Sequence, residues 1–81
     1  MKYTTVPHFD RAFSKMSTRV QIAFHKQAVL LLNNIRHPSL RAKKYDESGD
    51  VWQARVTSNV RFRFSIKNST YILLDIEKHL D

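Results

Sequence analysis

Two runs of alternating residues between Val51 and Ile66 constrain the fold of this 81-residue chain more than any other segment. The first run reads V-W-Q-A-R-V, and the second, after the turn residues T-S-N, reads V-R-F-R-F-S-I. Apolar residues alternate with polar or charged ones, a pattern typical of antiparallel strands with one face in the core and the other in water. The sequence therefore predicts a β-hairpin here.

The length of the connecting loop decides which side chains face each other across this hairpin. A three-residue loop over 57–59 keeps apolar residues opposite apolar residues, whereas a two-residue loop over 58–59 mixes the two faces. We therefore expect the three-residue loop. The expected opposing pairs are Val56 and Val60, Ala54 and Phe62, Trp52 and Phe64, Arg55 and Arg61, and Gln53 and Arg63.

This register sets two arginines, Arg55 and Arg61, directly opposite each other on the polar face of the hairpin. Like charges in that arrangement destabilise a sheet, by about 0.2–1 kcal/mol per pair. One interpretation is a solvated face that prevents edge-to-edge aggregation. The other, which we favour, is a site for an anion such as phosphate, since the planar guanidinium binds phosphate with paired hydrogen bonds.

Length, charge and cysteine content limit the class of protein. A chain of 81 residues forms one domain, here 1–81, and without cysteine it has neither disulfides nor thiolate metal sites. The net charge of +7 indicates an anionic partner: nucleic acid first, an acidic protein second, an anionic membrane surface third. No run approaches the roughly 20 apolar residues that span a bilayer, and no signal peptide is evident, so we expect a cytoplasmic protein with no membrane partner.

The segments before the hairpin predict one strand and two helices. Residues 2–6 are β-branched and aromatic and precede a proline, which favours an edge strand. Apolar residues at helical spacing predict a helix over 9–16 and a second over about 18–36, with Ser17 or Thr18 as its cap. The expected apolar face of the second helix comprises Val20, Ile22, Ala23, Phe24, Ala28, Val29, Leu30, Leu31 and Ile35.

Residues 39–50 are expected to form one long connection into the hairpin. It holds a basic cluster of Arg41, Lys43 and Lys44. These side chains have two possible roles: they contact phosphate, or they are simply solvated. Its acidic residues are interpreted as solubilising the loop rather than as metal ligands; they are Asp46, Glu47 and Asp50.

The last strand is predicted over 70–77, after a three-residue turn at 67–69. With this turn, Arg61 is expected to lie opposite Asp75, which we interpret as a structural partner that orients the arginine. His79 then lies two steps further along the same face. The two arginines and this histidine would therefore share one surface.

The order of a strand, two helices and a basic antiparallel sheet resembles the RelE/ParE superfamily, the toxins of bacterial toxin–antitoxin modules. The matching segments are H-P-S-L-R-A-K-K, V-W-Q-A-R-V-T-S-N-V-R-F-R-F and I-L-L-D-I-E-K-H. The resemblance covers essentially the whole chain. It implies an α+β fold, with an N-terminal strand and a two-helix hairpin packed on a twisted, mainly antiparallel sheet of about four strands.

The resemblance also implies a function. RelE-like members are endoribonucleases that cut mRNA on the ribosome, with neither a metal nor a small-molecule cofactor, by attack of the ribose 2′-hydroxyl on the adjacent phosphate. ParE-like members instead inhibit DNA gyrase. Both kinds are neutralised by an antitoxin, so a small acidic antitoxin is the expected protein partner, and mRNA and the ribosome are further partners of a nuclease.

Site residues are carried over from the family position by position. Arg61 matches the arginine that contacts the scissile phosphate, Arg55 a basic residue of the preceding strand, and His79 an arginine or histidine of the last strand. These three are the predicted catalytic residues, with histidine as the proton-transfer group. The predicted RNA- or phosphate-binding residues are Arg41, Lys43, Lys44, Gln53 and Arg63, and no metal ligand is predicted.

Three functions stay open on the sequence. We favour the ribosome-dependent mRNA endoribonuclease over a non-enzymatic, ParE-like gyrase inhibitor and over a basic RNA-binding module without toxicity. Departures from the nuclease pattern support the gyrase inhibitor. Gln53 stands where some nucleases have a lysine, Val60 replaces an aromatic residue, and the sequence ending at Asp81 shows no counterpart of a C-terminal tyrosine or extra helix.

Overall fold

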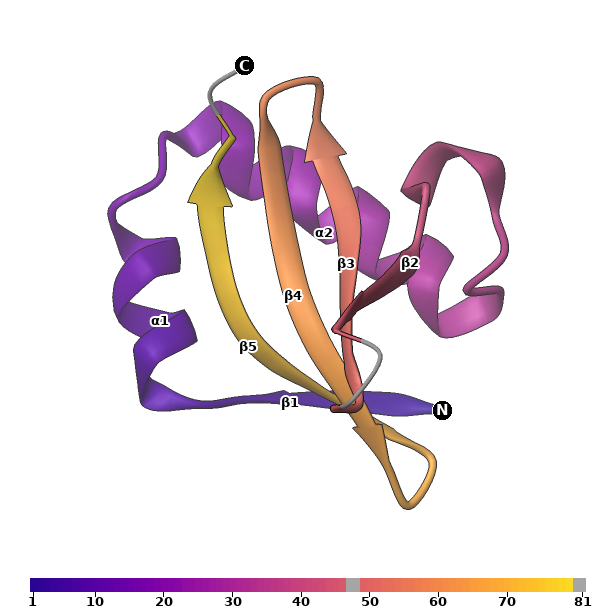
Figure 1. Ribbon diagram of the computed structural model, residues 1–81. Helices are drawn as coiled ribbons and strands as arrows, with labels where there is room; N and C mark the ends of the chain where they lie inside the picture. The colour runs from indigo at the N-terminus through magenta and orange to yellow at the C-terminus, as the bar shows by residue number, and fades with distance from the viewer. Residues whose placement is uncertain (47–48, 80–81) are drawn as a thin grey trace.

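In the computed structural model, which describes residues 1–46 and 49–79, two helices pack against a five-stranded sheet (Figure 1). The elements are β1 (Lys2–Thr5), α1 (Pro7–Ser14), α2 (Thr18–Asn33), a 3-10 helix η1 (Pro38–Leu40), β2 (Lys43–Asp46), β3 (Val51–Thr57), β4 (Val60–Lys67) and β5 (Thr70–Lys78). The strand order is β1-β5-β4-β3-β2, and only β1, paired with β5, runs parallel to its neighbour. The predicted α+β fold with a mainly antiparallel sheet is confirmed.

The sheet has one strand more than expected, because β2 forms within the segment predicted to be a connection. All four of its residues are exposed, and its sequence K-K-Y-D has no apolar alternation. A strand without a buried face leaves no periodic signal in the sequence. It forms because its backbone pairs with β3, setting Lys43 opposite Gln53 and Lys44 opposite Trp52.

Both predicted helices are present, with shifted ends. The first helix starts earlier, at Pro7, because the fixed φ of proline suits the first turn. Ser17 caps α2 as expected, since its side chain accepts a hydrogen bond from the backbone N–H of Val20 at 3.2 Å. Assigning Ile22 and Val29 to the apolar face was wrong, because they are 66% and 57% exposed.

The core lies between the helices and one face of the sheet. The alternation in β3 and β4 is confirmed, with Phe62 and Phe64 fully buried and the intervening arginines on the opposite face. Trp52 stacks on Phe64 with ring centroids 6.3 Å apart, in the predicted register. The core residues are Phe9, Phe24, Ala28, Leu31, Leu40, Ala54, Val56, Val60, Phe62, Phe64, Tyr71, Leu73 and Ile76.

The predicted hairpin loops were wrong in length. Both have two residues, 58–59 and 68–69, and each strand pair contains one β-bulge. Asn68 and Ser69 both have positive φ, as in the two-residue turns that match the twist of paired strands. In the first hairpin, the bulge restores four of the five expected pairs, but Thr57 rather than Val56 lies opposite Val60.

The expected register between β4 and β5 was also wrong. Arg61 lies opposite Glu77, and Asp75 lies opposite Arg63. The two-residue loop shifts the expected register by one position, and a bulge between Arg63 and Phe64 shifts it by one more. The structure therefore contradicts the interpretation that Asp75 orients Arg61.

In the described part of the chain, no helix is both long and apolar enough to cross a membrane.

Candidate nucleic-acid interface

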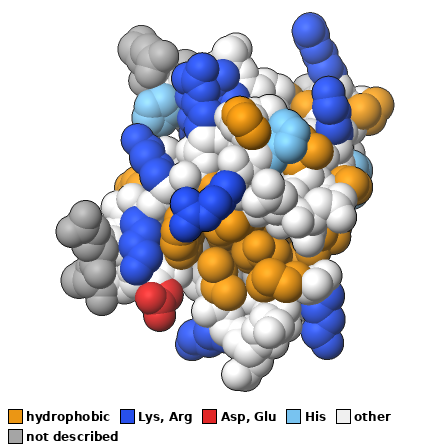
Figure 2. Space-filling model, turned by 90° about the vertical axis from the view of Figure 1, so that its right-hand side faces the viewer, with side chains coloured by type: hydrophobic (Ala, Val, Ile, Leu, Met, Phe, Trp, Pro, Cys, Tyr) orange, Lys and Arg blue, Asp and Glu red, His pale blue; other side chains and the backbone are white. Residues whose placement is uncertain are grey.

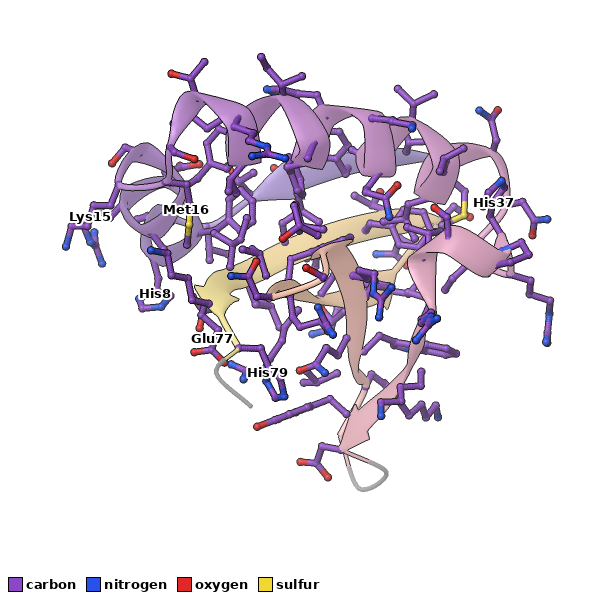
Figure 3. The ribbon with its side chains drawn as sticks, turned by 90° about the horizontal axis from the view of Figure 1, so that it is seen from above. His8, Lys15, Met16, His37, Glu77 and His79 are labelled. Atoms are coloured by element: carbon purple, nitrogen blue, oxygen red, sulfur yellow. The ribbon has the colours of Figure 1, made fainter. Side chains whose placement is uncertain are left out.

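A cavity of about 430 Å³ opens on the sheet face away from the core. It gathers side chains from the segment after η1, from β2, β3 and β4, and from the residue after β5. We call it the basic pocket, and it is lined by Arg41, Lys43, Gln53, Ala54, Arg55, Arg61 and His79. Six of the eight predicted site residues therefore come together, and no carboxylate is among the lining side chains of the described residues. Figure 3 shows His79 on the side of the sheet away from α2.

Arg55 is held in place by a buried amide that the sequence reasoning missed. Gln27 of α2 is only 6% exposed, and its Nε2 donates to the carbonyl of Arg55 at 2.9 Å and to that of Ser39 at 3.1 Å. The Ser39 hydroxyl donates to Oε1 of Gln27 at 3.1 Å. This amide joins α2, η1 and β3. A glutamine at helical spacing between Phe24 and Leu31 was the available signal, because an amide on an apolar face needs polar partners there.

Arg41 enters the basic pocket from a left-handed backbone conformation. It ends η1 with φ 47° and ψ 41°, and its N–H donates to the carbonyl of Pro38 at 3.3 Å. Residues other than glycine rarely adopt this region, and where they do, surrounding structure must hold them. The Gln27 amide supplies such a hold by fixing the Ser39 carbonyl of η1.

The guanidinium of Arg61 lies on the β3–β4 turn. Its Nη1 donates to the carbonyls of Thr57 at 2.7 Å, Ser58 at 3.2 Å and Val60 at 3.2 Å. The turn therefore provides partial negative charge to this arginine. It also holds the end of β5, because the N–H of His79 donates to the carbonyl of Asn59 at 2.7 Å.

Desolvation and neighbouring positive charge both disfavour the charged form of Arg55. The pKa of its guanidinium is lowered from its usual value, first by desolvation and then by repulsion from Arg41 and Arg61. Its Nε is buried and has no hydrogen-bond partner among the described residues. An anion in the basic pocket would offset the repulsion with opposite charge and would give Nε a hydrogen-bond acceptor.

Two predicted binding residues, Lys44 and Arg63, lie outside the basic pocket. Lys44 lies opposite Trp52, and its ammonium is 6.0 Å from the centre of that ring. Arg63 forms ion pairs with Asp75, at 3.3 Å, and with Glu77.

Asp75 also contacts His8 of α1, with 3.1 Å between Oδ1 and Nε2. The ring of Tyr45 lies over the Arg63 guanidinium, with 4.4 Å between the guanidinium carbon and the ring centre. We call this group the Arg63 network; it comprises His8, Tyr45, Arg63, Asp75 and Glu77.

A second cavity of about 450 Å³ adjoins the basic pocket and shares Arg41 and Arg55 with it. Lys26 of α2 adds a further positive charge at this cavity. The remaining lining residues are Ala23, Gln27, Pro38, Ser39 and Val56. The positive surface therefore continues from the sheet towards α2. Within residues 1–46 and 49–79, no three His, Asp or Glu side chains are grouped as metal ligands.

No protein-family model matches this sequence, and no curated protein sequence matches it significantly. Solved structures do match. The YoeB/ParE toxin from Agrobacterium tumefaciens has a TM-score of 0.81 at 12% identity, covering 99% of this chain and 100% of that one. The isolated Escherichia coli RelE toxin has a TM-score of 0.76 at 13% identity, covering 98% and 84%.

The toxin–antitoxin complex RelB–RelE from Methanococcus jannaschii matches with a TM-score of 0.76 at 12% identity, covering 91% of this chain and 87% of that chain. The fold is thus the one shared by RelE, ParE and YoeB toxins, as the sequence resemblance implied.

Proposed function

We propose that this chain is the toxin of a type II toxin–antitoxin module and acts as a metal-independent, ribosome-dependent mRNA endoribonuclease. The observation that carries the proposal is the basic pocket, where four cations and a histidine meet with no carboxylate among the described lining residues. The similarity in fold to RelE and YoeB toxins supports the same class. A cytoplasmic location follows from the proposed substrate.

The proposed reaction is attack of a ribose 2′-hydroxyl on the adjacent phosphorus. The new bond joins O2′ to phosphorus, the bond from phosphorus to O5′ breaks, and the products carry a 2′,3′-cyclic phosphate and a 5′-hydroxyl. Arg55 and Arg61 bind the non-bridging oxygens, where negative charge grows in the transition state. His79 donates a proton to the departing O5′, and the proton of the 2′-hydroxyl leaves to water.

The other polar residues of the basic pocket hold the strand on either side of the cleaved bond. Arg41 and Lys43 bind flanking phosphates, and the amide of Gln53 hydrogen-bonds to sugar or base. Phosphate contacts of this kind position an RNA without selecting its sequence. Specificity for messages on the ribosome then depends on docking, which suits a pocket open on one face of a small domain.

Cleavage on purified ribosomes tests the proposal. Ribosomes programmed with a defined message are mixed with the protein, and the ends of the RNA products are analysed. We expect a cut within the ribosomal A site, with a 2′,3′-cyclic phosphate on the upstream product. Intact message at protein concentrations that arrest growth would reject the nuclease function.

We also propose a small acidic antitoxin as partner. The net charge of +7 and the antitoxin–toxin complexes among similar structures support it. On the face shown in Figure 2, basic side chains surround an exposed apolar area, and acidic side chains are scarce. Such a surface fits a partner that combines carboxylates with apolar anchors. Co-purification from the native operon tests this, and the complex should weaken with added salt.

A ParE-like gyrase inhibitor is the second candidate. Exposed Ile22 and Val29 on the outer side of α2 favour it, because exposed apolar side chains on a helix suit a protein contact. In that case replacing both by serine would remove toxicity, and Arg61→Ala would leave it intact. Binding of RNA without growth arrest would instead indicate the third possibility, an RNA-binding module without toxicity.

A further inference from the structure

Tyr45 is an exposed aromatic residue beside the basic pocket. Its side chain is 56% exposed, so the core does not require it. The ladder between β2 and β3 pairs Lys44 with Trp52 and Asp46 with Val51, which makes Tyr45 the extra residue of a bulge. Bulges often redirect a side chain next to a functional site.

The bulge places the Tyr45 ring on a fixed support. The guanidinium carbon of Arg63 is 4.4 Å from the ring centre, and Arg63 is itself held by Asp75 and Glu77. A guanidinium anchored by two carboxylates is a rigid platform, and its contact with the ring is favourable. One face of the ring is thereby occupied, and the exposure of the side chain leaves surface for a second planar group.

The strand register places this ring next to the basic pocket. Gln53, which lines the pocket, is the ladder neighbour of Lys43 on one side and of Arg63 on the other. Tyr45 follows Lys43 by two residues on the same strand and covers Arg63. A nucleotide whose phosphate lies in the basic pocket therefore has an aromatic ring within its neighbourhood.

We propose that Tyr45 stacks on an unpaired nucleobase of the bound RNA, at a nucleotide flanking the cleaved bond. The inference rests on the proposed nuclease function and adds a base-binding site to it. Every nucleobase has a π-face, so stacking holds single-stranded RNA without selecting its sequence. Loss of one stacked base weakens binding roughly 5- to 150-fold, judged from aromatic residues in other proteins that bind single strands.

Single-turnover cleavage of ribosome-bound message, with protein in excess over message but below saturation, tests the role of the ring. Tyr45→Ala should slow cleavage by roughly 5- to 150-fold, while Tyr45→Phe keeps the rate within about twofold, because the ring and not the hydroxyl stacks. Tyr3→Ala is the matched control, since Tyr3 is 36% exposed and lies on the opposite edge strand. It should cleave at the wild-type rate. Circular dichroism verifies that each variant is folded.

Messages with an abasic nucleotide on either side of the cleaved bond distinguish two roles of the Tyr45 ring. The ring either stacks on a base of the RNA or only packs over Arg63. At one of these positions the missing base should slow the wild-type protein by the same factor as Tyr45→Ala, and combining both changes should have no further effect. An equal loss with Tyr45→Ala on intact and on both abasic messages would overturn the inference. Wild-type cleavage by Tyr45→Ala on the intact message would overturn it as well.

Failure of the proposed function gives a different result from failure of this inference. If the wild-type protein cuts no message, the nuclease function is rejected and the stacking site with it. If the wild-type protein cuts and Tyr45→Phe loses as much activity as Tyr45→Ala, only the stacking role is rejected.

Discussion

Arg61 and Arg63 lie two residues apart on the same face of β4, yet their surroundings are opposite. Arg63 is ion-paired with Asp75 and Glu77. Among the hydrogen bonds of the described residues, the Arg61 side chain contacts only backbone carbonyls in and beside the β3–β4 turn, and Arg61 lies opposite Arg55 in the ladder. Its other ladder neighbour is Glu77, but that carboxylate bonds to Arg63.

The difference separates a charge that supports the fold from a charge that is available to a ligand. The Arg63 network balances one guanidinium with two carboxylates, whereas the basic pocket concentrates four cations without a lining carboxylate in the described part of the chain. Two arginines that face each other destabilise a sheet by about 0.2–1 kcal/mol, so the pair in the basic pocket lowers the stability of the free protein. An arriving phosphate would reverse that cost.

The largest expected effect separates His79 of the basic pocket from His8 of the Arg63 network. His79→Ala should lower the rate of single-turnover cleavage by about 10²–10⁴-fold, because it removes the proposed proton donor to the leaving oxygen. His8→Ala, the control from the Arg63 network, should change the rate by less than about twofold. Equal losses for both histidines would show that the two regions are not functionally distinct.

The arginines should differ by a smaller factor in the same assay. Arg61→Ala should slow cleavage by about 10²–10³-fold, as expected for one donor to a developing oxyanion. Arg63→Gln should cost less than about tenfold, through the loss of support for the Tyr45 ring. If Arg63→Gln is as damaging as Arg61→Ala, the Arg63 network is part of the phosphate site.

Stability should show the reverse order. In urea unfolding, Arg63→Gln should lower the free energy of unfolding by about 1–2 kcal/mol, because two neighbouring carboxylates lose a half-buried partner. Arg61→Ala should change it by no more than about 0.5 kcal/mol, since lost turn contacts are offset by relief of repulsion from Arg55. A large loss for Arg61→Ala would mean that its contacts with the turn are mainly structural.

Salt dependence sharpens the comparison further. Binding of a short single-stranded RNA should weaken with salt, and each phosphate contact contributes about 0.7 to the slope of log K against log salt. Arg61→Ala should reduce the magnitude of the slope by about 0.7, and Arg63→Gln should leave it unchanged. Fluorescence titration at several salt concentrations measures both. An equal reduction for both variants would mean that Arg63 also contacts phosphate.

The sequence was sufficient to predict the elements that carry a periodic signal. The buried and exposed faces of β3 and β4, the Trp52–Phe64 pair and the Ser17 cap all follow from local patterns. The same alternation predicts that Arg55 and Arg61 point away from the core. Two of the cations of the basic pocket could therefore be predicted from the sequence.

The remaining features depend on contacts between elements. β2 exists only through its pairing with β3, and the loop length and the bulge that together set Glu77 opposite Arg61 depend on two strands at once. The same holds for the placement of Lys44 and Arg63 outside the basic pocket. The Gln27 amide shows the limit most clearly, because its partners lie 12 and 28 residues further along the chain.

Mapping RNA ends in growing cells tests the central claim most directly. The wild-type chain and Arg61→Ala are each induced, and primer extension on translated messages is compared with growth. We expect arrest with discrete cuts in translated regions for the wild type, and neither arrest nor cuts for Arg61→Ala. Arrest of equal strength from both proteins, with uncut messages, would contradict a phosphate-binding role for the basic pocket and favour gyrase inhibition.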